Sequence, residues 1–287
     1  MNERVCCERA AMSGRPFVFK FGGELIEDAA TLNTAVTAIA AAACIAPLVV
    51  IHGGGREIDA ALKRTGIEPR QVDGLRITDA ATLDVVVAVL AGTVNTRFVA
   101  ALTTAGVAAV GLTGADAECG LSQRAPAHRS VEGRTIDLGH VGVPIDRADV
   151  RLLTTLLGEG FVPVVASIGI GGDGQLLNVN ADTLAGHLAA RLGAQRLVIA
   201  GTTPGVLDGS GQTVGLLESS AIAQMVTSGT ATAGMIAKLR ACEHALAGGV
   251  GDVVIVDGRD GAAIEAAAGG GVPASATRVV ATATQTM

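Results

Sequence analysis

Residues 17–23 read Phe17-Val18-Phe19-Lys20-Phe21-Gly22-Gly23, an apolar run that holds one lysine and stops at two glycines. An apolar run of this length, bounded by a glycine turn, is typical of a strand that is buried on both faces. Such strands belong to parallel sheets that are covered by helices on either side. A lysine ammonium inside one is costly to bury unless an anion lies beside it. The stretch therefore predicts a central strand that ends beside a negatively charged group.

The rest of the chain repeats this pattern of short β-branched runs separated by longer runs rich in Ala and Leu. We expect strands at residues 17–21, 48–52, 108–112, 162–168, 196–200 and 253–257. We expect helices at residues 28–44, 54–65, 79–104, 147–158, 181–192, 218–228 and 235–247. Strands that alternate with helices predict an α/β fold, a three-layer αβα sandwich around a mainly parallel sheet.

The composition excludes several classes of protein. The 287 residues carry a net charge of −6 and only 2% aromatic residues, with no Trp or Tyr, which disfavours both phosphate-backbone binding and base stacking. We therefore expect no nucleic acid partner. The longest apolar run, residues 35–51, is rich in Ala and is broken by Pro47, so it predicts a helix end followed by a strand. No membrane association is expected.

We expect the protein to be cytoplasmic. Residues 1–16 carry both acidic and basic side chains and lack the apolar core of a secretory signal. The five cysteines are odd in number, scattered and without a C-x-x-C pair. This pattern predicts neither a disulfide framework nor a zinc site, and it fits a reducing compartment.

Changes in composition along the chain indicate how it is divided. Residues 113–144 are polar, contain Gly and Pro, and predict a hairpin or lid. A glycine-rich break at residues 169–174 predicts the boundary between two lobes. We expect an N-terminal tail at 1–15, an N-terminal lobe at 16–175 and a C-terminal lobe at 176–287.

Glycine turns follow three of the expected strands. They are Gly22-Gly23, then Gly53-Gly54-Gly55 at the start of a helix, and the run from Gly169 to Gly174. A strand, a glycine turn and a helix N-terminus together make an anion site, although a single such turn is also typical of a tight connection. The third turn matches G-x-G-x-x-G, but no helical pattern follows it, which disfavours dinucleotide binding.

Lysine usage is the sharpest signal of function. Only three of the 21 cationic residues are lysines, and Arg stands almost everywhere else. Lys63, on the polar side of a helix end, is typical of a solvated surface cation. Lys20 in its apolar strand and Lys238 at a helix start are candidates for a compact ammonium that contacts phosphate.

Polar residues elsewhere have a structural and a functional interpretation. In Asn178-Val179-Asn180-Ala181-Asp182, Asn180 is expected to cap a helix whose first turn holds Asp182. The Asp182 carboxylate is also suited to hold two lysines in place, and the two roles are compatible. Arg76, taken alone, is more typical of a surface cation than of a carboxylate clamp.

Eight motifs together, in order from about residue 17 to 259, resemble those of the N-acetylglutamate kinases, a family of the amino acid kinase superfamily. The residues that carry this resemblance are Lys20–Gly23, Val50–Gly55, Asp73–Thr78, Gly111–Gly114, Asp137–Gly142, Asn178–Asp182, Pro204–Asp208 and Gly234–Lys238. The stretch from Thr277 to Val280 resembles the family's closing strand.

The resemblance implies an amino acid kinase-like fold and an enzyme that uses ATP, accompanied by Mg²⁺. It implies phosphorylation of the γ-carboxylate of N-acetyl-L-glutamate to N-acetyl-L-glutamyl 5-phosphate, a step of arginine biosynthesis. The N-terminal lobe would bind the acyl amino acid and the C-terminal lobe would bind ATP. A homodimer is expected through the helix that contains Val85–Leu90, a segment that is apolar all round.

The resemblance also assigns roles residue by residue. Lys20, Lys238 and Asp182 match the catalytic residues, and Gly22 and Gly23 match a phosphate-binding turn. Gly53, Gly54, Arg76 and Asn178 match positions that bind the acceptor substrate and the transferred group. The nucleotide-binding positions are Thr202, Gly205, Val206 and Leu207, with Thr202 where the family usually carries Asp. No side chain is expected to ligate a metal directly.

Three other functions stay open at this point. One is a related kinase that acts on another carboxylate, carrier-bound or free. Another is a non-catalytic sensor of nucleotide or amino acid with the same fold, which the missing Asp at Thr202 favours. A nicotinamide dehydrogenase is the most distant, because it rests only on the turn at 169–174.

Overall fold

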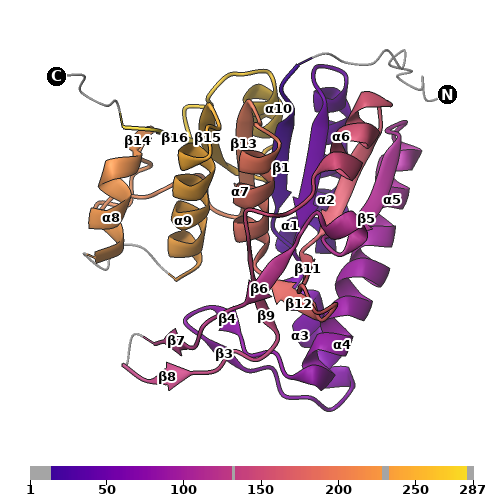
Figure 1. Cartoon of the computed structure of the whole chain (residues 1–287). Helices are drawn as coiled ribbons and strands as arrows, with labels where there is room; N and C mark the ends of the chain where they lie inside the picture. Colours follow the sequence, from indigo (N-terminus) through magenta and orange to yellow (C-terminus); the bar gives the residue numbers. More distant parts are fainter. Residues whose placement is uncertain (1–13, 131–132, 228–232, 283–287) are drawn as a thin grey trace.

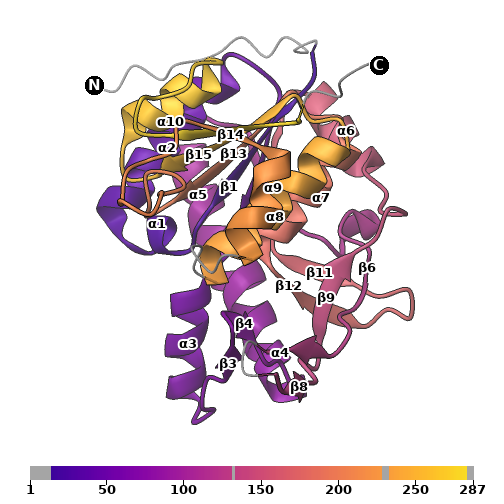
Figure 2. The same ribbon diagram turned by 90° about the vertical axis from the view of Figure 1, so that its left-hand side faces the viewer.

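The fold is built around one eight-stranded sheet that lies between two layers of helices (Figures 1 and 2). The computed structural model describes residues 14–130, 133–227 and 233–282. The strand order is β14-β16-β15-β13-β1-β2-β10-β5, and every neighbouring pair is parallel except β15 with β16. This confirms the predicted α/β sandwich. Most of the tail expected at 1–15 lies outside the described residues.

All six predicted strands belong to this sheet, together with two short strands at one edge. The strands are β1 Phe17–Phe21, β2 Leu48–His52, β5 Ala109–Thr113, β10 Val162–Ala166, β13 Arg196–Gly201, β14 Leu216–Glu218, β15 Asp252–Asp257 and β16 Thr277–Val280. β1 lies at the centre, paired with β13 on one side and with β2 on the other. The residues from Thr277 to Val280 form the closing strand that was predicted.

Helices cover both faces of the sheet. The helices are α1 Glu24–Glu27, α2 Ala29–Ala43, α3 Gly55–Arg64, α4 Ala80–Val87, α5 Asn95–Thr104, α6 Arg151–Gly158, α7 Ala181–Arg191, α8 Ser219–Thr227, α9 Ala233–Ala247 and α10 Gly261–Ala268. Figure 2 shows α2, α5 and α10 on one face and α6, α7 and α9 on the other. The seven predicted helices are confirmed, whereas α1 and α10 were not predicted. The long predicted helix at 79–104 contains a π-helical segment, η1 Ala88–Val94, between α4 and α5.

The two faces of β1 explain why the sheet is covered on both sides. Phe17, Phe19 and Phe21 pack into the core beneath α2, α5 and α10, whereas Val18 packs into the second core, beneath α7 and α9. Side chains alternate across a strand, so Lys20 shares the α7 face with Val18. The lysine therefore lies in the layer that also holds α7 and α9.

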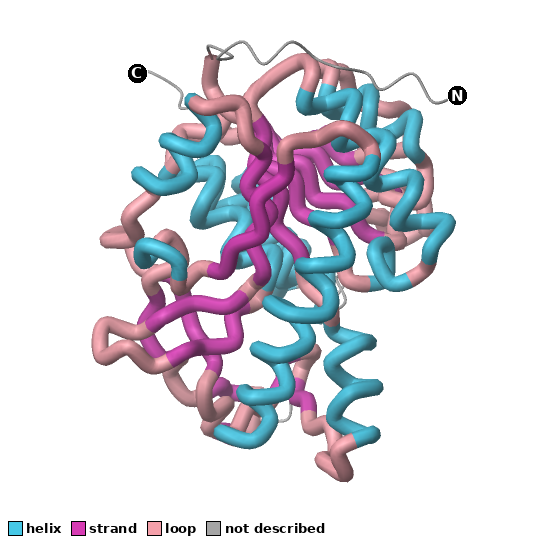
Figure 3. The backbone as a smooth tube through the Cα atoms, turned by 90° about the vertical axis from the view of Figure 1, so that its right-hand side faces the viewer, coloured by secondary structure: helices cyan, strands magenta, loops and turns pink. Residues whose placement is uncertain are grey.

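A smaller, four-stranded sheet lies at one end of the large one (Figure 3). It consists of β11 Ile168–Ile170, β12 Leu176–Val179, β9 Val141–Pro144 and β6 Ser122–Arg124. The predicted hairpin within 113–144 is present as β7 His128–Arg129 and β8 Thr135–Ile136, and the same segment also supplies β6 and β9. The G-x-G-x-x-G match is the turn between β11 and β12, so a strand follows it and not a helix.

The predicted lobe boundary at 169–174 coincides with this β11–β12 turn. The large sheet nevertheless continues from one predicted lobe into the other, because β1 pairs with β13 along the whole length of β1. The two lobes therefore share a backbone hydrogen-bond network, and their separate roles stay a prediction.

One helical stretch of the described residues, Ala80–Thr104, is long and apolar enough to cross a membrane by composition alone. One face of it is part of the core, where Val86, Leu90, Val94 and Phe98 are buried. That packing accounts for much of its apolar character.

Among the described cysteines, Cys119 and Cys242 are free and buried, whereas Cys44 is disulfide-bonded. One disulfide-bonded cysteine among the described residues does not make a disulfide framework.

A buried ion pair ties the sheet to α10. The Arg196 guanidinium contacts both carboxylate oxygens of Asp252 at 2.7 Å and donates to the carbonyls of Ala267 and Gly271. Both partners of the ion pair are nearly inaccessible to solvent. Removal of one partner leaves the other charge buried without compensation.

We predict that Asp252→Ala lowers the free energy of unfolding by about 3–5 kcal/mol, because Arg196 then lacks its counter-ion. Urea denaturation monitored by circular dichroism measures this loss. Asp149→Ala is the matched control, because Asp149 pairs with Arg151 by the same type of contact on the surface. An equal loss in both variants contradicts the account.

Candidate active site

A cavity of about 300 Å³ lies where β1 and β2 end. In open α/β sheets, ligands bind beyond the carboxyl ends of the strands. Nine residues predicted from the sequence line this cavity: Lys20, Gly22, Gly23, Gly53, Gly54, Arg76, Asn178, Asp182 and Lys238. Residues that are more than 200 positions apart in the chain therefore meet in one place.

The two candidate lysines meet at one carboxylate. Lys20 Nζ lies 3.0 Å from Asp182 Oδ1, and Lys238 Nζ lies 3.7 Å from Asp182 Oδ2. Lys20 and Asp182 are both 5% exposed. The carboxylate thus supplies the anion that the buried lysine requires. With two ammonium groups and one carboxylate, this part of the site carries an excess of positive charge and suits an anionic ligand.

Local structure explains how Asp182 reaches the lysines. Asn180 caps α7, with its side-chain oxygen accepting from the amide of Thr183 at 3.0 Å. The cap places Asp182 in the first turn, where the helix dipole also favours a carboxylate. The expected cap at Asn180 is therefore present, and the Asp182 carboxylate lies between the two lysines, while its role in organising them stays a prediction. Lys238 comes from α9, which packs directly along α7.

The two glycine turns touch each other. A Cβ added to Gly23 would lie 2.6 Å from Gly54 Cα, so no larger residue fits there without a shift of the backbone. The Gly22 amide donates to Ala200 and the Gly53 amide donates to Phe21, so these two donors are used within the protein. α3 begins at Gly55, and its N-cap residue is Gly54, which supplies no side-chain cap. Its first-turn amides are therefore suited to receive an anion.

Arg76 and Asn178 line the same cavity from elements outside the large sheet. Arg76 is on the hairpin that β3 Gln71–Val72 forms with β4 Leu75–Arg76. Its Nη1 lies 2.6 Å from Asp59 Oδ1, and its Nη2 donates to the Gly55 carbonyl at 3.2 Å. Asn178 on β12 donates to Thr78 Oγ1 at 3.0 Å. Asp59, which the sequence analysis did not identify, holds the guanidinium against α3.

The predicted nucleotide-binding residues lie apart from the walls of this cavity. Thr202, Gly205, Val206 and Leu207 follow the end of β13. The Thr202 carbonyl accepts from Arg259 at 3.0 Å, and the buried Val206 amide donates to Thr277 at 2.8 Å. β13 ends at Gly201, where an added Cβ would lie 3.5 Å from Lys238 Cε. This segment therefore begins beside Lys238 and extends away from the cavity.

His52 and Asn95 support the second glycine turn and were not identified from the sequence. Both are buried, and Asn95 Nδ2 donates to His52 Nε2 at 3.0 Å and to the Val164 carbonyl at 2.9 Å. His52 Nδ1 then carries the proton and donates to the Gly53 carbonyl at 3.0 Å. Asn95 follows the π-helical segment η1, a type of distortion that is frequent near functional sites.

The model of the amino acid kinase family matches residues 15–257. The chain belongs to this family. An acetylglutamate kinase of Novosphingobium aromaticivorans is 40% identical over 262 residues, which cover 86% of this chain and 84% of that protein. An acetylglutamate kinase of Symbiobacterium thermophilum is 42% identical over 254 residues, which cover 86% and 85%. The resemblance seen in the motifs is thus confirmed across most of the chain.

Solved structures of this family share the fold. An N-acetylglutamate synthase from Neisseria gonorrhoeae, complexed with coenzyme A and N-acetyl-glutamate, aligns with a TM-score of 0.78 and 24% identity. The alignment covers 95% of this chain and 61% of that one. At such identity, the likeness to this amino acid kinase relative concerns the fold alone.

We predict that His52 makes stability depend on pH. Burial lowers the pKa of His52 from 6.5 to about 4, so between these values the unfolded chain binds a proton that the folded chain does not. The stabilising contribution is complete above pH 6.5 and is lost as the pH falls toward 4. Between pH 7.5 and 5 the free energy of unfolding should fall by about 2 kcal/mol more in the wild type than in His52→Gln.

Urea denaturation at several pH values measures the two slopes. The comparison of slopes, and not of absolute stabilities, removes any constant cost of replacing His52. Identical slopes in the two proteins contradict the role given to this imidazole.

Proposed function

We propose that this protein transfers the terminal phosphoryl group of ATP to the γ-carboxylate of N-acetyl-L-glutamate, in the biosynthesis of arginine. The observation that carries the proposal is the meeting of Lys20, Lys238 and Asp182 at two glycine turns in one cavity. The acetylglutamate kinases that are 40% and 42% identical support the choice of substrate.

The chemistry needs little more than this arrangement. A carboxylate is already a nucleophile at neutral pH, so the reaction requires alignment of two anions and neutralisation of charge on the phosphoryl group. One ammonium at 4 Å contributes about 4 kcal/mol at an effective dielectric constant of about 20. At about 1.4 kcal/mol for a tenfold change in rate, each lysine can supply a factor of roughly a hundred or more.

Each lining residue has a proposed role. Lys20 and Lys238 stabilise the charge on the migrating phosphoryl group, and Asp182 orients both ammonium groups. The amides at Gly23 and at the start of α3 bind phosphate oxygens. Arg76 and Asn178 hold the acceptor through its carboxylate and amide. We assign the acyl amino acid to the N-terminal lobe, 16–175, and the nucleotide to the C-terminal lobe, 176–287, including Thr202 to Leu207.

The residues present fit ATP with Mg²⁺ bound through the nucleotide. Of the described residues that line the cavity, Glu24 and Asp182 are the carboxylates, and Asp182 already pairs with two lysines. Mg²⁺ keeps water and phosphate oxygens as its preferred ligands, so the protein need supply few of its own. When bound, the cation neutralises phosphate charge, while the lysines and glycine amides of this chain position the reacting group.

Trapping of the acyl phosphate with hydroxylamine tests the proposed function. With ATP and Mg²⁺, N-acetylglutamate should give hydroxamate, and equal concentrations of glutamate or aspartate should give far less. Hydroxamate from another carboxylate alone would identify a related kinase of different specificity. The absence of hydroxamate from every carboxylate would identify a sensor and contradict the proposal.

We predict that Lys238→Met lowers kcat at least 100-fold, because the phosphoryl group loses one of its two ammonium partners. Coupled measurement of ADP release gives kcat, and circular dichroism checks that the variant is folded. Lys63→Met is the matched control, since Lys63 is exposed on α3 and should leave kcat unchanged. Near-normal turnover in Lys238→Met removes this residue from the catalytic group.

We also propose that the protein is a cytoplasmic homodimer. The outer face of the α4–η1–α5 helix, opposite the buried Leu90, exposes small residues such as Ala88 and Gly92. An open hollow of about 560 Å³ lies beside it, lined by Leu83, Ala88 and residues 173–176 among others. Small exposed residues allow a second helix to approach closely, and an apolar face of this kind favours a partner.

A charge placed on this face should prevent the association. We predict that the wild type sediments at twice its mass of 28.5 kDa and that Ala88→Glu sediments as a monomer. Ala41→Glu, at an exposed position of α2, is the control that should stay dimeric. Analytical ultracentrifugation distinguishes the states, and a dimeric Ala88→Glu variant contradicts the proposed interface.

A further inference from the structure

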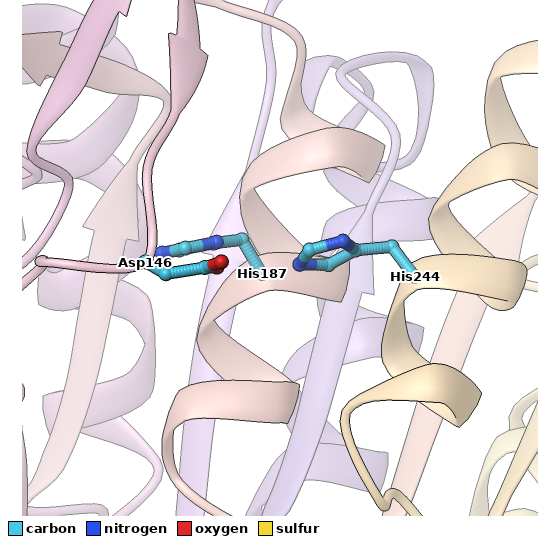
Figure 4. Close-up of side chains that lie close together, drawn as sticks. All are labelled: Asp146, His187 and His244. Carbon is cyan, nitrogen blue, oxygen red and sulfur yellow. The ribbon is translucent and has the colours of Figure 1, made fainter.

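Three side chains outside the kinase cavity converge on the surface of the α7–α9 layer (Figure 4). His187 comes from α7 and His244 from the last turn of α9. Asp146 comes from the loop between β9 and α6. In Figure 4 the two imidazole rings face each other and the Asp146 carboxylate lies beside His187. These residues take no part in the proposed phosphoryl transfer.

The distances suit a metal ion. One ligand atom from each residue lies within 4.8 Å of the other two. The two rings are stacked at 5.5 Å with an interplanar angle of 20°, so one ring must turn before both nitrogen lone pairs, which lie in the ring planes, can point at the same ion. The centre of a triangle with sides of 4.8 Å lies about 2.8 Å from each corner. Zinc binds histidine nitrogen at about 2.0–2.1 Å and carboxylate oxygen at about 2.0–2.2 Å. Inward movement of less than 1 Å per ligand, together with rotation of the exposed His244 ring out of the stack, would complete the coordination.

The burial pattern tells which ligands can move. His187 is 1% exposed, whereas Asp146 and His244 are exposed to solvent. The closing movement can therefore come from the two exposed side chains while His187 stays in place. The exposed pair also leaves a path for an ion to enter and an open position for water.

His187 has an unpartnered buried nitrogen. Its Nε2 has no hydrogen-bond partner, which is uncommon and unfavourable for a buried polar atom. A neutral imidazole is the form that binds a metal. A cation bound to Nε2 would supply the missing partner.

The scaffold around the two histidines is tightly packed. A Cβ added to Gly186, next to His187, would lie 2.6 Å from the carbonyl oxygen of Ala241, one turn before His244. α7 and α9 therefore approach each other as closely as their backbones allow at this point. Ligands on rigidly packed helices lose little freedom when a metal binds.

Of the charged groups near His187, one opposes the binding of a cation and another favours it. The Arg191 guanidinium lies near enough to His187 to disfavour a second positive charge, and it donates to the Ala148 carbonyl at 3.2 Å. The Asp146 carboxylate has the opposite effect and is itself one of the three ligand groups. A divalent ion bound directly to Asp146 gains more from that carboxylate than it loses to the more distant guanidinium.

We propose that Asp146, His187 and His244 form a binding site for a borderline transition-metal cation, with Zn²⁺ as the best match. Two imidazoles and one carboxylate are the ligand set of zinc sites that keep a fourth position for water. Mg²⁺ and Ca²⁺ prefer oxygen ligands throughout. The ion would join α7 to α9, the helices that carry Asp182 and Lys238.

Binding of ZnCl₂ to the full chain, without an affinity tag and after treatment with a chelator, tests the site by isothermal titration calorimetry. The wild type should show a site that is weakened at least 10-fold in His244→Gln and in Asp146→Asn. Both residues are exposed, so the variants should fold. Glu243→Gln is the matched control, because it removes a charge beside His244 without removing a ligand.

Thermal unfolding gives a second, independent measurement. Zn²⁺ should raise the Tm of the wild type and of Glu243→Gln, because the ion binds the folded chain. The increase should be absent in His244→Gln, and MgCl₂ should give none in any of the proteins. Zn²⁺ affinity and Tm increases that are the same in the wild type and in both ligand variants overturn the proposal. Neither measurement depends on kinase activity.

Discussion

The pairing of Lys20 with Asp182 is the constraint on which the rest of the structure depends. An ammonium and a carboxylate, both 5% exposed, lie 3.0 Å apart between the central strand and the first turn of α7. Removal of two charges from water costs several kcal/mol per ion, and their mutual attraction compensates for this only when the geometry is good. β1 and the start of α7 must therefore stay in a fixed relation, and the cap at Asn180 helps to maintain it.

The fixed position of β1 relative to the start of α7 also explains why the site is positively charged. Since Asp182 is shared between Lys20 and Lys238, the two ammonium groups lie near each other without full neutralisation. The glycine turns at Gly23 and Gly54 lie against each other beside them, where backbone amides add further positive potential. Such a cavity suits an anion that carries more than one negative charge. The site is organised before a ligand arrives, which is the property that transfer of a phosphoryl group most requires.

The packing of α7 against α9 links the proposed kinase site to the proposed metal site. Asp182 and His187 are one and a half turns apart on α7, and Lys238 and His244 are similarly spaced on α9. The contact of Gly186 with Ala241 lies between these two levels. A metal ion at one level would therefore hold the same pair of helices that positions the lysine pair at the other.

Much of the fold and of the candidate site could be predicted from local sequence, because the strands of the large sheet are continuous apolar runs and the lysines are scarce. The cap at Asn180 and the turn at Gly53 also have local signatures. The smaller sheet was only partly anticipated, since β6 and β11 have three residues each and no clear period. Asp59, Asn95 and the pair His187 and His244 were missed because their partners are 17 to 57 positions away and no spacing rule connects them.

A double-mutant cycle on kcat tests the central claim most directly, with Asp182→Asn, Lys238→Met and the double variant. If Asp182 acts by orienting the lysines, part of its effect is lost once Lys238 is gone. The account predicts that the double variant loses clearly less activity than the product of the two single losses. Losses that multiply without any coupling would show that the carboxylate and the lysine act independently, and would contradict the account.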